Sequence, residues 1–433
     1  MLEWITLAIF LVTIVLMIWS PIEPSIIGGF GVIVMIIIGI ISPVEAFQFV
    51  DWNILAILIG LWIISIYLIK ASRPEGLISV LIKRVKSFRA LVFALIFFAG
   101  MVTMFVDNVL VVLLFCPIMI TICKTLKQDP FVPTILTGLA ANLMGTALLL
   151  GDITPQFLHS IAHFEFMDFI VFRGKPSAFP ILIITFLIVI YLYTTRFYKC
   201  ESQHIDLKAL IGNGIAGRNP RLLKIALVFF VGTIILMIFR QNLGVPLGSI
   251  TFSGAIALIL CVEILNKKGG LNGPTFQQIL GEVEWRAVFF YAFLFILVGS
   301  LEKVGLIKMF ADAIFPFLSN LIVGVPVLYL ISASLSTIVE HDAYCLIMYK
   351  MLGDLTTIPG FNVYPYFWTV AISSTLASNA TIVAAPALYV CWTLLEKAGV
   401  KVTSKAFHSV TIKFTLITLA INFFIAYALL VLI

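Results

Sequence analysis

Charged residues are scarce in this sequence. Of its 433 residues, 11% are Asp, Glu, Lys or Arg, whereas 62% are hydrophobic, and the mean hydropathy is +1.16. A soluble domain cannot bury that much apolar surface, but a chain that repeatedly crosses a bilayer exposes it to lipid. The net charge of +6 gives no reason to expect a nucleic acid partner. The composition predicts a multi-pass protein whose main partner is the lipid bilayer.

Catalytic and metal-binding motifs are absent as well. The six cysteines form no Cys-x-x-Cys pair and no His/Cys cluster at metal-ligand spacing. We expect them to be packing residues, with binding of a soft metalloid at Cys116 or Cys345 as the alternative. No Gly-x-x-x-x-Gly-Lys-Ser/Thr loop and no Ser/His/Asp arrangement is present, so we expect neither an enzyme nor a cofactor other than a coupling ion.

Ten apolar segments are long enough to cross the hydrocarbon core of a membrane. They cover 3–19, 26–42, 53–70, 130–151, 178–196, 223–240, 248–265, 286–301, 364–390 and 408–433. The segment 3–19 lacks the features of a cleaved signal peptide and is kept as the first span. Two further stretches, 89–125 and 319–353, carry charge at their midpoints, and we interpret each as a re-entrant hairpin of two short helices.

One pattern occurs in both halves of the chain. Val50-Asp51-Trp52 precedes Asp107-Asn108 just as Val283-Glu284-Trp285 precedes Glu340-His341. The acids are 56 positions apart in each copy, and the two copies are offset by 233 residues. Internal duplication with polar interruptions inside apolar spans is typical of secondary transporters. We therefore predict a first repeat at 1–196, a cytoplasmic linker at 197–222 and a second repeat at 223–433.

The distribution of lysine and arginine predicts the orientation of the repeats. The basic residues between 70 and 89, those of the linker, Lys267, Lys268 and those between 397 and 405 fall on one side when the ten spans are threaded in order. The positive-inside rule makes that side the cytoplasm. The N-terminus is then outside, the hairpin 89–125 opens to the cytoplasm and the hairpin 319–353 opens to the outside, so the repeats are inverted. In each half an amphipathic segment, 76–87 or 305–318, precedes the hairpin.

Polar residues inside the spans mark the expected site, because non-helical backbone at membrane depth is tolerated only where it lines a polar cavity. The hairpin tips and two broken helices supply hydroxyls, amides, small residues and acids that can bind an ion. The predicted substrate- or ion-binding residues are Thr103, Asp107, Asn108, Asn142, Gly145, Thr146, Asp152, Thr154, Thr337, Glu340, His341, Ser378, Asn379 and Thr381. We expect Asp342 in the same cavity, and no lysine or arginine at that depth.

Several of these residues also have a purely structural interpretation. Asp107 and Asp152 can cap helices, and Glu340 can pair with His341 at the hairpin mouth. His159 and His163 lie four residues apart and could form a proton relay, although an interfacial polar patch is the simpler interpretation. The acids and tryptophans at 51–52 and 284–285 are expected to anchor span entrances.

The sequence resembles the ion transporter superfamily, in the branch that holds arsenite efflux permeases, NhaD-type sodium/proton antiporters, the melanosomal P protein and citrate transporter-like permeases. The likeness covers nearly the whole chain. It is carried by Val50-Asp51-Trp52, Val283-Glu284-Trp285, Asp107-Asn108, Gly145-Thr146, Gly151-Asp152 and Glu396-Lys397-Ala398-Gly399. It implies two inverted repeats, each with a scaffold part and a transport part, in a protein that is commonly a homodimer. Glu340-His341 stands where relatives often carry a second Asp-Asn.

An acid-rich cavity without basic residues favours cations or protons. We therefore expect a secondary active transporter in the plasma membrane that moves a small ion or metalloid by proton- or sodium-coupled alternating access, with Asp107 and Glu340 as titrating groups. The alternatives are a citrate or dicarboxylate permease and an arsenite efflux subunit that works with a separate ATPase. A channel is disfavoured, because two repeats in one chain supply the polar breaks.

Overall fold

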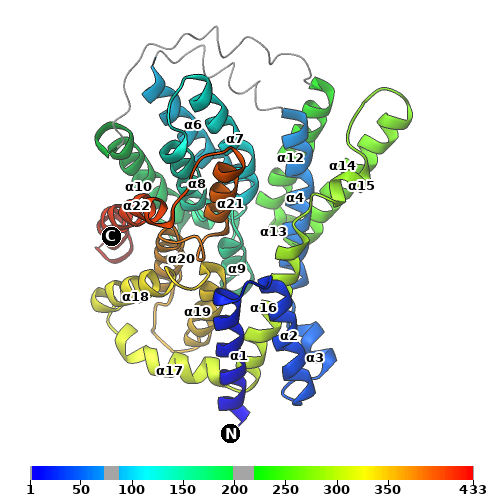
Figure 1. The fold of residues 1–433 in the computed structure, drawn as a ribbon. Helices are drawn as coiled ribbons and strands as arrows, with labels where there is room; N and C mark the ends of the chain where they lie inside the picture. The colour runs from blue at the N-terminus through cyan, green and yellow to red at the C-terminus, as the bar shows by residue number, and fades with distance from the viewer. Residues whose placement is uncertain (1, 73–86, 198–218, 433) are drawn as a thin grey trace.

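The protein is almost entirely helical (Figure 1). The computed structural model describes residues 2–72, 87–197 and 219–432. Within these residues, eight helices are long and apolar enough to cross a membrane. One small antiparallel sheet pairs β1 (Val171–Phe172) with β2 (Lys175–Pro176). The predicted all-α polytopic membrane protein is confirmed.

The helices of the first half follow the expected segments closely. They are α1 (Leu2–Trp19), α2 (Pro24–Ile37), α3 (Pro43–Phe49), α4 (Trp52–Ser72), α6 (Phe88–Thr103), α7 (Asn108–Thr125), α8 (Phe131–Gly145), α9 (Ile153–Ala162) and α10 (Ala178–Leu192). The 3₁₀ helix η1 (Phe166–Phe169) lies between α9 and β1, and the π-helical turn η2 (Tyr193–Phe197) follows α10. The segment 130–151, expected as a broken span, is interrupted after Gly145.

The second half repeats this order of elements. Its helices are α12 (Pro220–Ile238), α13 (Arg240–Leu243), α14 (Leu247–Lys267), α15 (Phe276–Leu280), α16 (Trp285–Lys303), α17 (Leu306–Leu318), α18 (Leu321–Leu335), α19 (His341–Leu355), α20 (Tyr364–Ser378), α21 (Pro386–Lys397) and α22 (Ser404–Tyr427), with a π-helical turn η3 (Ala428–Leu432). The long helix–short helix–long helix order of α14 to α16 matches that of α2 to α4. The inverted orientation and the domain boundaries stay predictions.

The duplicated tryptophans occupy equivalent places. Trp52 begins α4 and Trp285 begins α16, and each indole N–H donates a hydrogen bond to the carbonyl oxygen five residues earlier. Those bonds measure 3.1 Å to Phe47 and 2.9 Å to Leu280. Both acceptors belong to a short helix, α3 or α15, that begins with a capping box. The same local sequence signal therefore builds the same helix entrance twice.

Three predicted segments differ from the structure or lie mostly outside the described residues. The span expected at 26–42 ends as a helix at Ile37, because Gly39 takes a left-handed conformation with φ of 81° and Ser42 then caps α3. Most of the amphipathic segment 76–87 and of the linker 197–222 lies outside the described residues. The second amphipathic segment, 305–318, forms the helix α17.

The two halves of the chain are interlocked. Helix α4 of the first half packs along α14 of the second, and α16 of the second packs along α2 of the first. Two glycines allow the first of these contacts, because a Cβ on Gly60 would lie 2.6 Å from the Thr251 backbone and one on Gly248 would lie 2.5 Å from the Asn53 carbonyl oxygen. Farther along the chain, α9 packs against α19, and α21 packs against α7 and α8. These crossed contacts bring the hairpin of each half beside the broken helix of the other.

Candidate functional site

The site lies where the hairpin turns and the helix breaks meet. The turns lie between α6 and α7 and between α18 and α19, and the breaks separate α8 from α9 and α20 from α21. Acids cap three of the helices that begin there. Asp107 Oδ1 accepts from the Val109 and Leu110 N–H groups, Asp152 Oδ1 from the Ile153 N–H, and Glu340 Oε2 from the Ala343 N–H. Asp107 and Asp152 thus cap helices, as their structural interpretation predicts, whereas capping by Glu340 was not expected.

The first hairpin touches the first helix break through Gly151. A Cβ on this residue would lie 2.1 Å from the Thr103 carbonyl oxygen and 2.5 Å from the Gly145 carbonyl oxygen. Both are backbone atoms that cannot turn aside, so only glycine fits. This contact sets Asp152, the next residue, beside the start of α7.

A chain of buried amides connects the two breaks. Asn108 Nδ2 donates to Asn142 Oδ1 at 3.2 Å and to Asp152 Oδ2 at 3.0 Å. The Asn142 amide in turn lies within hydrogen-bonding distance of Ser378 Oγ at 2.9 Å and Asn379 Oδ1 at 3.1 Å. All five side chains are buried. Buried amides are costly unless they are paired, and here each is paired with another predicted site residue.

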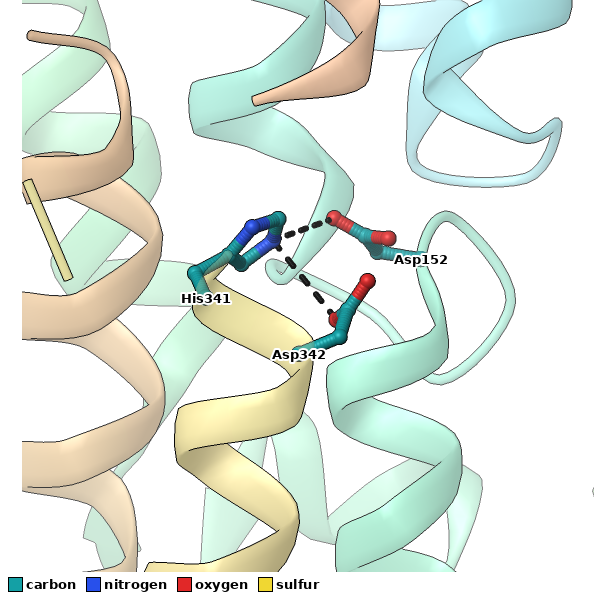
Figure 2. A group of neighbouring side chains, drawn as sticks. All are labelled: Asp152, His341 and Asp342. Atoms are coloured by element: carbon teal, nitrogen blue, oxygen red, sulfur yellow. Dashed lines mark hydrogen bonds and ion pairs between the residues drawn. The ribbon is translucent and has the colours of Figure 1, made fainter. Parts of the chain in front are cut away.

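Asp152, His341 and Asp342 form the centre of the site (Figure 2). His341 begins α19 and points its Nε2 at both acids, at 3.4 Å from Asp152 Oδ2 and 3.6 Å from Asp342 Oδ1. One ligand atom of each residue lies within 4.8 Å of the others. The three come from positions up to 190 residues apart, which is why local spacing in the sequence shows no such cluster.

Hydrogen-bond donors surround both carboxylates of this cluster. Asp342 accepts from the Thr154 hydroxyl at 2.5 Å and from the Tyr291 hydroxyl at 2.8 Å, one donor on each carboxylate oxygen. Both oxygens of Asp152 also accept, from Ile153 and Asn108. His341 Nδ1 lies 3.1 Å from the Ala384 carbonyl oxygen, which can only accept, so Nδ1 carries a hydrogen. His341 Nε2 faces Asp152 Oδ2 and Asp342 Oδ1, so a hydrogen on this nitrogen lies between two carboxylates.

Several oxygen atoms at the hairpin tips are buried and have no hydrogen-bond partner among the described residues. They are Thr103 Oγ1 at the first tip, and Ser336 Oγ and Glu340 Oε1 at the second. Glu340 Oε1 lies 3.4 Å from His341 Nδ1, a contact between charged groups when the ring is protonated. Hydroxyl and carboxylate oxygens are suitable ligands for a hard cation.

The remaining predicted residues lie close to this network. Thr146 and the unpredicted Thr375 share a hydrogen bond of 2.7 Å between hydroxyls. Thr381 donates to the Thr337 carbonyl oxygen at 2.8 Å, which ties the second break to the second tip. A Cβ added to Gly145 would lie 3.2 Å from Asp152 Oδ2, so this glycine lies against the carboxylate. Asp107 caps α7, and no hydrogen bond joins its carboxylate to the Asp152, His341 and Asp342 cluster.

Two site residues had weak signals or none in the sequence. Tyr291 lies in a phenylalanine-rich span, where its hydroxyl at mid-helix was the only hint of a polar role. The Ala384 carbonyl oxygen lies in the break before α21, outside any helix, and no residue type in the sequence predicts that it accepts a hydrogen bond there. Packing between distant segments creates both contacts.

The side chains outside this network have other partners. The Cys116 and Cys391 sulfur atoms, from α7 and α21, are buried and lie 3.5 Å apart, a pairing that no spacing in the sequence predicts. Buried His159 lies 2.8 Å from the Phe164 carbonyl oxygen through Nδ1, whereas His163 takes a left-handed conformation at the end of α9. Asp51 accepts from Ser160, which links the entrance of α4 to α9.

These features define a membrane transport protein: an all-α polytopic chain whose polar side chains gather at interrupted helices between its halves. The chain belongs to the citrate transporter family (CitMHS), whose sequence pattern matches residues 14–373.

The relatives of this chain include several transporters. It is 25% identical over 365 residues to an uncharacterized transporter of Mycobacterium tuberculosis, covering 82% of this chain and 81% of the relative. It is 23% identical over 429 residues to an uncharacterized transporter of Synechocystis, covering 91% and 90%. The human P protein is 23% identical over 442 residues, covering 83% of this chain and 51% of the P protein. The resemblance to the permease superfamily is thereby confirmed.

Proposed function

We propose that this protein is a proton-coupled secondary active transporter in the plasma membrane that moves a small ion or metalloid by alternating access. The single observation that carries the proposal is the position of His341 between Asp152 and Asp342, at the junction of the two halves. Histidine can gain and lose a proton near neutral pH, and carboxylates beside it can hold the positive form. The cluster is therefore suited to exchanging a proton against a cargo.

The electrostatics favour a positively charged or neutral cargo. Among the acidic, basic and histidine side chains in the described part of the chain, the buried ones are Asp152, His159, His341 and Asp342, with no lysine or arginine among them. An anion brought to this site would meet the carboxylates without a fixed positive charge to balance them. The buried oxygens of Thr103, Ser336 and Glu340 that have no hydrogen-bond partner among the described residues offer additional ligands for a cation.

A proton suits the centre better than sodium as the coupling ion. Hard cations such as sodium prefer shells made of oxygen, whereas here an imidazole nitrogen faces both carboxylates. All four oxygens of Asp152 and Asp342 already accept hydrogen bonds from Asn108, Ile153, Thr154 and Tyr291. A proton between Nε2 and Oδ2 fits without displacing any of these donors.

Transport of an organic anion is the second candidate function, and the citrate description of the family favours it. A polycarboxylate would need compensation for the acids of the site. The N-termini of α7, α9, α19 and α21 converge there and carry partial positive charge. A cation bound to the anion would provide further compensation.

The proposal is tested by following proton and cargo movement together. Proteoliposomes with a trapped pH dye and an imposed proton gradient would be challenged with sodium, lithium, arsenite, citrate, and citrate with a divalent cation. We expect at least one cargo to move protons in a fixed ratio to its own flux. A cargo that moves at full rate without any proton movement would refute proton coupling, and the cargo that responds decides between the two candidates.

A further inference from the structure

A polar pocket opens next to the site, at the entrance of α4. Its volume is about 330 Å³, enough for roughly ten water molecules at about 30 Å³ each. Its rim carries the exposed side chains of Gln48 and Trp52, and its walls carry Asp51, Ser160 and Lys350. Its floor is apolar and buried, formed by Phe157, Phe295 and Leu346. The pocket is thus open at one end and closed by large side chains at the other.

The floor of the pocket is also the cover of the Asp152, His341 and Asp342 cluster. The ring of Phe157 packs edge-to-face on Phe295 at 5.6 Å and on Tyr291 at 6.4 Å between ring centroids. Tyr291 does not line the pocket, and its hydroxyl donates to Asp342 at 2.8 Å. One layer of aromatic rings therefore separates the pocket from the cluster.

Two helices present the same order of residues from the cluster to the pocket. Along α9, Thr154 binds Asp342, Phe157 forms the floor, and Ser160 lines the wall. These positions are three residues apart and share one helix face. The distance from Thr154 to Ser160 along the axis is about 9 Å at 1.5 Å per residue.

Helix α19 repeats this order with Asp342, Leu346 and Lys350, spaced by four residues. On α16, Tyr291 and Phe295 are likewise four residues apart, and Glu302 farther on binds Lys350 at 2.5 Å. All three helices therefore run from the cluster toward the pocket.

We propose that this pocket is the mouth of the cargo's path to the cluster, and that Phe157, Phe295 and Leu346 are the gate that closes it in the conformation seen here. The proposal rests on the proposed function, because it assigns an entrance to the same site. Phe157 and Leu346 lie on the helices that carry the cluster, and Phe295 lies on α16, which pairs with α2. Movement of α9 and α19 away from α16 opens the gate and breaks the hydrogen bond between the Tyr291 hydroxyl and Asp342.

Thiol labelling tests the gate without requiring transport. In a chain whose six native cysteines are replaced, Ser160→Cys reports on the pocket and Thr154→Cys reports on the far side of the gate. Proteoliposomes would receive a charged methanethiosulfonate reagent on both sides of the membrane. We expect rapid labelling of Ser160→Cys, slow labelling of Thr154→Cys, and at least tenfold faster labelling of Thr154→Cys when Phe157→Ala and Phe295→Ala are added.

Phe186→Ala is the matched control, since it removes a buried ring of α10 outside the layer and should leave both labelling rates unchanged. Slow labelling of Ser160→Cys would contradict the proposed gate. A labelling rate of Thr154→Cys that stays the same after Phe157→Ala and Phe295→Ala would contradict it as well. Absence of proton coupling alongside the expected labelling pattern would instead refute the proposed function alone.

Discussion

Asn142 joins the two halves of the protein through one amide group. Its carbonyl oxygen accepts from Asn108 of the first hairpin, and its nitrogen lies beside Ser378 and Asn379 at the second helix break. The side chain is fully buried. Since each of these partners is also buried, a change at this residue affects polar groups in both halves at once.

Replacing Asn142 with Ala should therefore lower stability as well as transport. The substitution leaves Ser378 Oγ and Asn379 Oδ1 without their donor, and a buried unpaired group costs on the order of 1–3 kcal/mol. We expect a lower midpoint of thermal unfolding in detergent, measured by intrinsic fluorescence. Asn272→Ala, at an exposed asparagine, is the control and should leave the midpoint unchanged. Equal midpoints for the two variants would contradict the bridging role.

At the scale of elements, the break between α8 and α9 determines where Asp152 lies. The helix stops at Gly145, and Gly151 lets the chain pass against the turn of the first hairpin. Asp152 then caps α9 and faces Asn108 and His341. The break is therefore what places polar groups of the candidate site inside an apolar span.

Gly151→Ala should disrupt this junction. Its new methyl group would meet two backbone carbonyl oxygens at 2.1 and 2.5 Å, so the hairpin and the break would have to move apart. We predict loss of coupled transport and a lower unfolding midpoint. Gly232→Ala on α12, where a Cβ meets nothing within 4 Å, is the matched control. Parental transport in Gly151→Ala would show that the close approach is not required.

The sequence predicted these elements well because its signals are local. A polar residue at the centre of an apolar run, such as Asp107 or Asn142, marks a turn or a break without knowledge of its partners. The pairing of His341 with Asp152 was not predictable, because 189 residues separate them and packing alone joins them. Tyr291 was missed for the same reason. Asp107 was expected to titrate, and that role stays untested, although its carboxylate caps α7.

At the scale of the whole molecule, the cluster lies between helices from both halves. Asp152 precedes α9, His341 and Asp342 begin α19, and Tyr291 reaches them from α16. Because α16 packs along α2 and α9 packs against α19, a relative movement of these pairs changes the surroundings of the proton position. Under the proposed function, coupling follows when the proton and the cargo favour different arrangements of the same helices.

Proton flux through His341 variants tests this account most directly. Proteoliposomes containing the parent, His341→Gln or His408→Gln would be compared for cargo-driven proton movement with a trapped pH dye. Glutamine retains hydrogen bonding but cannot carry the proton. His408, near the start of α22, lies outside the site: its ring packs against Phe407, and its hydrogen bonds to Ser404 are exposed. The account predicts at least a tenfold loss of proton movement in His341→Gln and near-parental movement in His408→Gln. Parental proton movement in a folded His341→Gln protein would contradict it.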